Sequence, residues 1–142
     1  MHCALDLSPL RQALTSLEDS LQVVADEAWL QNQSAAVRNT LFGGVVKHFA
    51  LVYELGMKML RRQIEAESAT PGETDQLGFR DLLRVGAEKR LIGDVEAWFR
   101  YRQMRGAKSH PDHSAHARQV REGVPPFLTD ALALLTALER RN

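Results

Sequence analysis

The sequence predicts an all-α protein, an up-and-down antiparallel bundle of four main helices plus a short one. Apolar residues recur in steps of three and four along most of the chain, which is the spacing of one face of a helix. Short runs rich in glycine, proline and polar residues separate these segments. The 142 residues suffice for one hydrophobic core and are few for two, so we expect a single domain over 1–142.

The composition excludes several classes of protein. Hydrophobic residues make up 44% of the chain and charged residues 25%, which is close to the globular average and unlike a disordered or fibrous chain. The 18 basic and 18 acidic residues cancel, so net charge alone does not attract this molecule to nucleic acid. A lone cysteine, Cys3, and a start without the order of a signal peptide favour the cytoplasm.

The first main helix is expected to begin at Ser8. Serine can accept a hydrogen bond from an amide at a helix start, and Pro9 loses nothing at the first helical position. One apolar stripe then runs in alternating steps of three and four through Leu7, Leu10, Leu14, Leu17, Leu21, Val24 and Ala28.

The second main helix is predicted over residues 34–67 and has a wide apolar face. Its most apolar stretch, residues 41–60, contains four polar side chains that would be costly in a bilayer, so we expect a core helix and no membrane span: Lys47, His48, Glu54 and Lys58. Three glycines weaken the helix by up to about 1 kcal/mol each, which predicts a closely packed neighbour or a slight kink at Gly43, Gly44 and Gly56.

A loop over residues 69–74 separates this helix from a short one that begins near Phe79 and ends at residues 91–93. Asp94 is placed to cap the next main helix, which carries Trp98 and stops near Gly106. Trp98 is more typical of an anchor for the bundle than of a platform for a base.

The last main helix continues through a pair of prolines. Apolar positions recur in steps of three and four on both sides of Pro125 and Pro126, so the helical register survives them. Prolines inside a helix usually cost about 3 kcal/mol, and we therefore expect one long helix with a kink at Pro125-Pro126.

Although the net charge of the chain is zero, one region of it is basic. Residues 89–121 contain eight basic residues against three acidic ones, whereas the rest of the chain is acidic overall. The ordinary interpretation is a solvated helix face, and the alternative is a surface that meets phosphate. The candidate substrate-binding residues of this region are Arg102, Lys108 and Ser109.

The sharpest local feature is the sequence RGAKSH over residues 105–110. On an uninterrupted helix, Arg105 and His110 would point roughly 140° apart. Gly106 favours the left-handed conformation that ends helices and Pro111 prevents the helix from resuming, so His110 can fold back towards Arg105. An arginine can hold a phosphodiester while a histidine moves protons near neutral pH, a combination suited to RNA cleavage by attack of the ribose 2′-hydroxyl.

Several motifs occur together in a recognisable order: YELGMKML over residues 53–60, FRDLL over residues 79–83, Trp98, and the RGAKSH turn. In this combination the chain resembles the nucleotidyltransferase substrate-binding proteins of the HEPN superfamily, which include the HepT-like toxins. The resemblance covers residues 37–138 and rests on the joint order and spacing of these motifs.

The resemblance implies a helical bundle that forms a homodimer and is encoded with a minimal nucleotidyltransferase as its partner or antitoxin. Members with the intact arginine, four-residue spacer and histidine are ribonucleases that need no metal or other cofactor, with a cleft between two protomers. Arg105 and His110 occupy those positions as the implied catalytic pair. Two departures stand out, because Gly106 replaces the usual asparagine and Asp112 replaces a tyrosine that the partner modifies in some toxins.

Alternatives remain open at this point. The chain could instead be a non-catalytic subunit that binds the nucleotidyltransferase or presents its substrate. Glu54 and Lys58 could line a ligand groove, although an ion pair within the helix is the simpler expectation, and His48 is expected in or near the core. A metal site at His110, Asp112, His113 and His116 is disfavoured because Pro111 interrupts the series.

Overall fold

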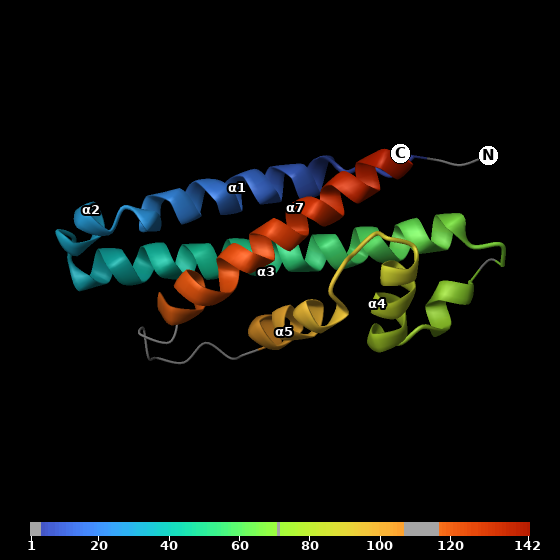
Figure 1. Ribbon diagram of the computed structural model, residues 1–142. Coiled ribbons are helices and arrows are strands. Elements are labelled where there is room, and N and C mark those ends of the chain that lie inside the picture. Colours follow the sequence, from blue (N-terminus) through green and yellow to red (C-terminus); the bar gives the residue numbers. More distant parts are fainter. Residues whose placement is uncertain (1–3, 71, 107–116) are drawn as a thin grey trace.

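The computed structural model describes residues 4–70, 72–106 and 117–142, and every regular element within them is helical. The two long helices α1 (Ser8–Ala25) and α3 (Ala35–Glu67) run antiparallel, and α7 (Val124–Arg141) packs across both of them (Figure 1). The predicted all-α antiparallel bundle is confirmed. No helix in the described ranges combines the length and the apolar character that crossing a bilayer requires.

The remaining elements cover the part of α3 that α1 leaves open. The short helix α4 (Phe79–Glu88) and the main helix α5 (Val95–Gly106) pack against α3 and against each other (Figure 1). Two further short elements are the α-helix α2 (Glu27–Gln31) and the 3₁₀ helix η1 (Glu73–Gln76). The last turn of α5 is thereby held beside the middle of α3, where the candidate site lies.

The first helix starts where the sequence predicts, but its capping residue differs. The Ser8 backbone N–H donates to Asp6 Oδ1 over 3.0 Å, so the side chain that caps the start is Asp6 and the expected cap by the Ser8 hydroxyl is wrong. The expected stripe continues to Ala28, whereas α1 ends at Ala25. Asp26 interrupts it and starts α2 by accepting a hydrogen bond from the Trp29 N–H over 3.1 Å.

The central helix α3 begins after Ser34, whose hydroxyl accepts from the Val37 N–H, and it ends at Glu67 as predicted. The expectation that a closely packed neighbour accounts for the glycines of α3 is confirmed at only one of them. A Cβ atom at Gly56 would lie 3.4 Å from Leu134 Cδ2, so α7 approaches α3 closely there. Gly43 and Gly44 have no described neighbour within 4 Å of such an atom, and packing does not explain them.

The ends of α4 and α5 follow local hydrogen bonds. α4 stops at Glu88, three residues before the predicted end, because the Leu91 N–H turns back to the Gly86 carbonyl and Arg90 takes a left-handed φ of 63°. Asp94 Oδ1 accepts from the backbone N–H groups of Glu96 and Ala97, which confirms the predicted cap of α5.

The centre of the core is an aromatic cluster contributed by three helices. The Phe127 ring on α7 meets Phe49 of α3 at 4.7 Å, and Tyr101 and Trp98 of α5 at 5.1 and 5.8 Å, all edge to face. These four side chains are buried, and Trp98 is only 1% exposed. Trp98 is therefore an anchor of the bundle, as expected, and its ring is not available to stack on a base.

A buried phenol also ties α5 to α7. The Tyr101 hydroxyl donates a short hydrogen bond to the Asp130 carboxylate. Burial and the neighbouring Asp130 charge both raise the pKa of the Tyr101 phenol, so it stays protonated and keeps donating at any physiological pH. This bond fixes the rotation of α5 about its own axis.

The expected single helix through the two prolines is confirmed, with a π-helical turn η2 (Gln119–Gly123) directly before them. The Val124 N–H reaches back five residues to the Gln119 carbonyl, so Pro125 and Pro126 fall in the first turn of α7. The wide turn also places Gly123 against α5, where a Cβ atom would lie 2.7 Å from Met104 Cε.

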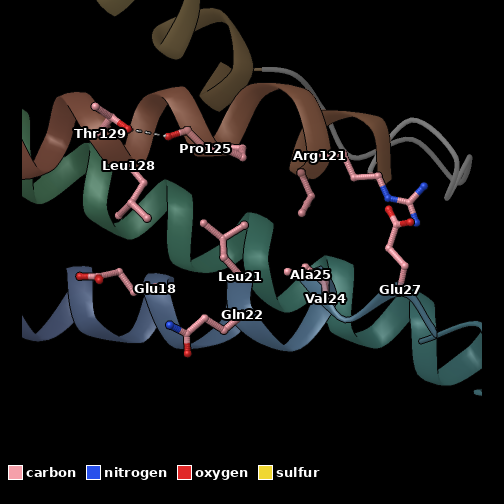
Figure 2. Close-up of a pocket in the computed structure, with 11 residues that line it drawn as sticks. Glu18, Leu21, Gln22, Val24, Ala25, Glu27, Arg121, Pro125, Leu128 and Thr129 are labelled. Carbon is pink, nitrogen blue, oxygen red and sulfur yellow. Dashed lines mark hydrogen bonds between the residues drawn. The ribbon is translucent and has the colours of Figure 1, made fainter. Parts of the chain in front are cut away.

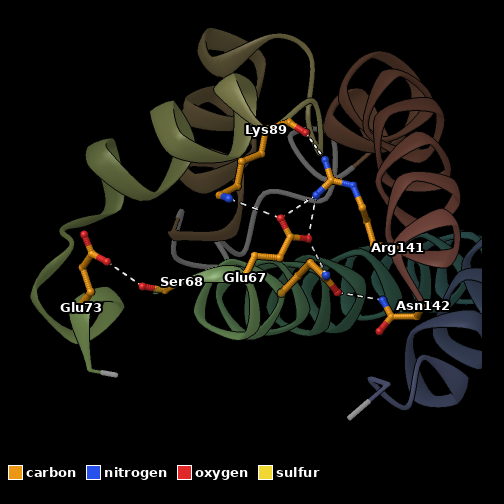
Figure 3. Close-up of polar contacts among 7 residues, drawn as sticks. Glu67, Ser68, Glu73, Lys89, Arg141 and Asn142 are labelled. Carbon is orange, nitrogen blue, oxygen red and sulfur yellow. Dashed lines mark hydrogen bonds and ion pairs between the residues drawn. The ribbon is translucent and has the colours of Figure 1, made fainter. Parts of the chain in front are cut away.

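The C-terminal end of α7 is held by a polar network around the Glu67 carboxylate (Figure 3). Arg141 Nη1 lies 2.6 Å from both carboxylate oxygens, Lys89 Nζ lies 3.3 Å from one of them, and Gln63 donates over 2.7 Å. Burial acts to raise the pKa of Glu67, but these hydrogen bonds outweigh it and hold the pKa below its ordinary value. Asn142 closes the network by donating to Gln63 over 2.8 Å.

Replacing Phe127 by alanine should lower the free energy of unfolding by about 3–5 kcal/mol, because the change opens a cavity among three other buried aromatic rings. Chemical denaturation followed by circular dichroism measures this loss. Leu51→Ala serves as the control, since that side chain is 47% exposed and should cost much less. Equal losses in the two variants would contradict the central role of Phe127.

The Glu67 network predicts a loss of stability in acid. The folded-state pKa of Glu67 lies below its ordinary value of 4.5, so its contribution to stability is complete above that pH and is lost as the pH falls through the folded-state pKa. Glu67→Gln should cost roughly 1 kcal/mol at pH 7 and progressively less as the pH falls below 4.5. Glu65→Gln is the control on the same helix, and a pH-independent cost for Glu67→Gln would contradict the linkage.

Candidate functional site

The last turn of α5 presents Arg105 at the surface beside α3. Its side chain is 40% exposed, and the described part of α5 extends one residue further, to Gly106. His110, the other half of the predicted pair, lies outside the described residues, as do Lys108 and Ser109. Of the sequence-predicted site residues, the structure therefore places Arg105 and Arg102, and it leaves the fold-back of His110 a prediction.

Arg105 is held by an acidic residue from the middle of α3. Arg105 Nε donates to Glu54 Oε1 over 3.0 Å, and Nη2 donates to the same oxygen. The expected ion pair between Glu54 and Lys58 within α3 is wrong, because the Glu54 carboxylate bonds across to α5. Fifty-one residues separate the partners, so no local spacing in the sequence could reveal this pair.

Arg102 lies one turn before Arg105 on the same helix. Its guanidinium carbon sits 4.2 Å from the centre of the Phe79 ring at the start of α4, a cation–π contact. Burial raises the pKa of the nearby Tyr53 phenol, whereas the positive charges of Arg102 and Arg105 act in the opposite direction. The two arginines and Tyr53 thus belong to one electrostatic neighbourhood at the junction of α3, α4 and α5.

A groove of about 370 Å³ runs along this junction. Its walls come from α3, α4 and α5, and its polar lining includes Glu54, Lys58, Arg61 and Arg102. The alternative that Glu54 and Lys58 line a groove is therefore confirmed in its geometry. Charged groups, one phenol and the exposed Arg105 beside them suit an anionic ligand with flat rings, such as a nucleotide.

A second groove of about 620 Å³ lies between the end of α1 and the start of α7 (Figure 2). Leu21, Val24 and Leu128 give it an apolar floor, and Glu18 and Glu27 stand on its rim. None of the described residues that line it belongs to the predicted site. We assign it no chemistry.

In the described part of the chain, no three histidine, cysteine, aspartate or glutamate side chains lie close enough together to hold a metal ion. The alternative metal ligands His110, Asp112, His113 and His116 lie outside that part. His48, expected in or near the core, is half-buried and its Nδ1 lies 3.0 Å from the Ser20 hydroxyl. This contact explains His48 as a structural residue.

Comparisons with known proteins agree with this arrangement. Residues 5–140 match the family described as nucleotidyltransferase substrate binding protein like. A curated Haemophilus influenzae relative named probable ribonuclease HepT is 35% identical over 138 residues, which cover 97% of this chain and 94% of the relative.

A solved structure from Haemophilus influenzae has the same fold. That protein is described as having the fold of a substrate binding domain of a nucleotidyltransferase, and it superposes with a TM-score of 0.88 at 34% identity. The match covers 94% of this chain and 99% of the other. The chain belongs to the family of nucleotidyltransferase substrate-binding proteins.

Proposed function

We propose that this protein is an endoribonuclease that cleaves RNA without a metal ion or other cofactor. Arg105 binds the scissile phosphate, His110 moves the proton, and Arg102, Lys108 and Ser109 bind the flanking RNA. The observation that carries the proposal is the exposed guanidinium of Arg105, held by Glu54 at the end of α5 beside a groove with further cations. The relative named probable ribonuclease HepT supports the same activity.

The proposed reaction needs no nucleophile from the protein. The ribose 2′-oxygen forms a bond to the adjacent phosphorus, and the bond from phosphorus to the 5′-oxygen of the next nucleotide breaks. The products carry a 2′,3′-cyclic phosphate and a 5′-hydroxyl. One proton leaves the 2′-hydroxyl and one reaches the departing 5′-oxygen, which is the task of a histidine near neutral pH. Arginine stabilises the charge that develops on the phosphoryl oxygens.

Glu54 is a positioning residue in this scheme. Its Oε1 atom binds Nε and Nη2 of Arg105. No described residue accepts a hydrogen bond from Nη1, which can bind a phosphate oxygen, and because the guanidinium is already oriented, less side-chain entropy is lost on binding.

The biological setting that we propose is a cytoplasmic toxin–antitoxin pair. The protein acts as a homodimer, and a cognate minimal nucleotidyltransferase is its antitoxin. The family and the solved structure of the Haemophilus influenzae protein support an association with a nucleotidyltransferase. Asp112 stands where related toxins have a tyrosine, so nucleotide transfer to that position is not part of the proposal.

A second function remains in competition, namely a non-catalytic subunit that presents substrate to the nucleotidyltransferase. The description of the solved relative as a substrate binding domain favours it. This role predicts a stable complex with the nucleotidyltransferase and no RNA cleavage by the purified free protein. One assay therefore separates the two functions.

The purified protein should cleave RNA in the presence of a chelator, and Arg105→Ala and His110→Ala should each lower the rate by about 10²–10⁴-fold. Gel electrophoresis of labelled RNA measures the rate. Arg140→Ala is the matched control, because that exposed arginine lies on α7 and lines a different hollow. Cleavage that survives in His110→Ala would remove the proposed role of the histidine, and no cleavage by the wild type would favour the second function.

The role of Glu54 predicts non-additive losses. Glu54→Gln should slow cleavage about 10-fold, because the neutral side chain orients the guanidinium less firmly. The double variant of Glu54→Gln and Arg105→Ala should be no slower than Arg105→Ala alone, since Glu54 acts through Arg105. Initial rates of the four forms test this, with Glu65→Gln as the control on the same helix. Additive losses would show that Glu54 acts elsewhere.

A further inference from the structure

The groove between α3, α4 and α5 contains two cations that the fold leaves accessible. Lys58 lies one turn after Glu54 on α3, it is exposed, and no ion pair among the described residues involves it. The third cation of the lining, Arg61, is occupied, because it donates to the carbonyls of Thr74 and Leu77 over 2.8 and 3.4 Å and so holds η1. Lys58 and Arg102 are therefore the groups left to bind an anion.

Arg102 is held in place by a row of contacts in which two phenylalanine rings lie between two guanidiniums. The Phe79 ring meets the Phe99 ring at 5.4 Å edge to face, Arg102 covers Phe79 at 4.2 Å, and Arg80 covers Phe99 at 4.8 Å. Both phenylalanines are half-buried. A guanidinium that lies over a ring keeps its in-plane N–H donors free, which is the geometry that binds phosphate oxygens.

The spacing along α5 relates this groove to the scissile position. Arg102 and Arg105 are three residues apart, so they lie on one face of the helix and are separated by about 4.5 Å along its axis. Lys58 and Glu54 are four residues apart on one face of α3. Glu54 binds Arg105 and both Lys58 and Arg102 line the groove, so the two pairs face each other across it.

We propose that Lys58 and Arg102 form a binding subsite for the phosphate next to the one that Arg105 engages in a single-stranded RNA. The inference rests on the proposed ribonuclease function and adds to it a residue, Lys58, and a path for the substrate. The strand runs from Arg105 along the groove, with its backbone between α3 and α5. Tyr53 and Phe79 form the wall of the groove between these two cations.

The salt dependence of RNA binding tests this subsite without any cleavage. The probe is a fluorescent single-stranded RNA with 2′-O-methyl riboses, which lack the attacking hydroxyl, and anisotropy gives the dissociation constant at several salt concentrations. Each phosphate contact with a single strand contributes about 0.7 to the slope of log K against log salt. Lys58→Ala and Arg102→Ala should each reduce the slope, and together by about that amount, because both side chains bind the same phosphate.

Two further variants sharpen the test. Arg140→Ala removes an exposed arginine outside the groove and should leave the slope unchanged. Arg102→Lys keeps the charge but loses the planar stack on Phe79, so it should keep the slope and weaken binding several-fold. Circular dichroism and thermal melting of every variant confirm that the fold is intact.

Unchanged slopes in Lys58→Ala and Arg102→Ala would overturn the subsite. The same holds if Arg140→Ala reduces the slope equally, or if the groove variants weaken only the complex with the nucleotidyltransferase. Because the modified RNA cannot be cleaved, this outcome is independent of the catalytic test. If the wild type does not cleave RNA but the groove variants reduce the slope, the subsite is retained and the nuclease function is excluded. If the wild type cleaves RNA and the slopes are unchanged, the nuclease function is retained and the subsite is excluded.

Discussion

The packing of Phe127 against three aromatic rings is the contact on which the rest of the molecule depends. It joins α7 to α3 through Phe49 and to α5 through Trp98 and Tyr101. Once these rings are buried, α5 has one position relative to α3, and the hydrogen bond from Tyr101 to Asp130 fixes its rotation. Arg105 reaches Glu54 only because of this alignment. The surface chemistry is thus set by contacts in the core.

The fold was predictable from the sequence wherever periodicity and capping act locally. The limits of α3 and the cap at Asp94 follow from residues that are neighbours in the chain. The errors have local causes too. Asp26 interrupts an apolar stripe that periodicity alone would continue, and Asp6 takes the capping role expected for Ser8.

The candidate site was predictable only in part. Arg105 and Arg102 stand out because they occur in a basic segment with a glycine at the helix end. The partner of Arg105 could not be predicted, because Glu54 comes from another helix and only tertiary packing brings the two side chains together. The contact of Arg102 with Phe79 could not be predicted either, because Phe79 begins the short helix α4 and its ring lies against the Arg102 guanidinium only in the folded chain. Spacing along one helix predicts ion pairs within that helix and misses those between helices.

The π-helical turn before α7 links the backbone of one helix to the charged end of another. Its extra residue gives the Val124 N–H a partner and brings Gly123 against Met104, the neighbour of Arg105 in sequence. A side chain at position 123 would press first on the flexible Met104 thioether and only then on the turn that carries the guanidinium. A small side chain at position 123 is therefore accommodated by a shift of the Met104 thioether, next to Arg105 in sequence, and not by a change in the backbone of α7.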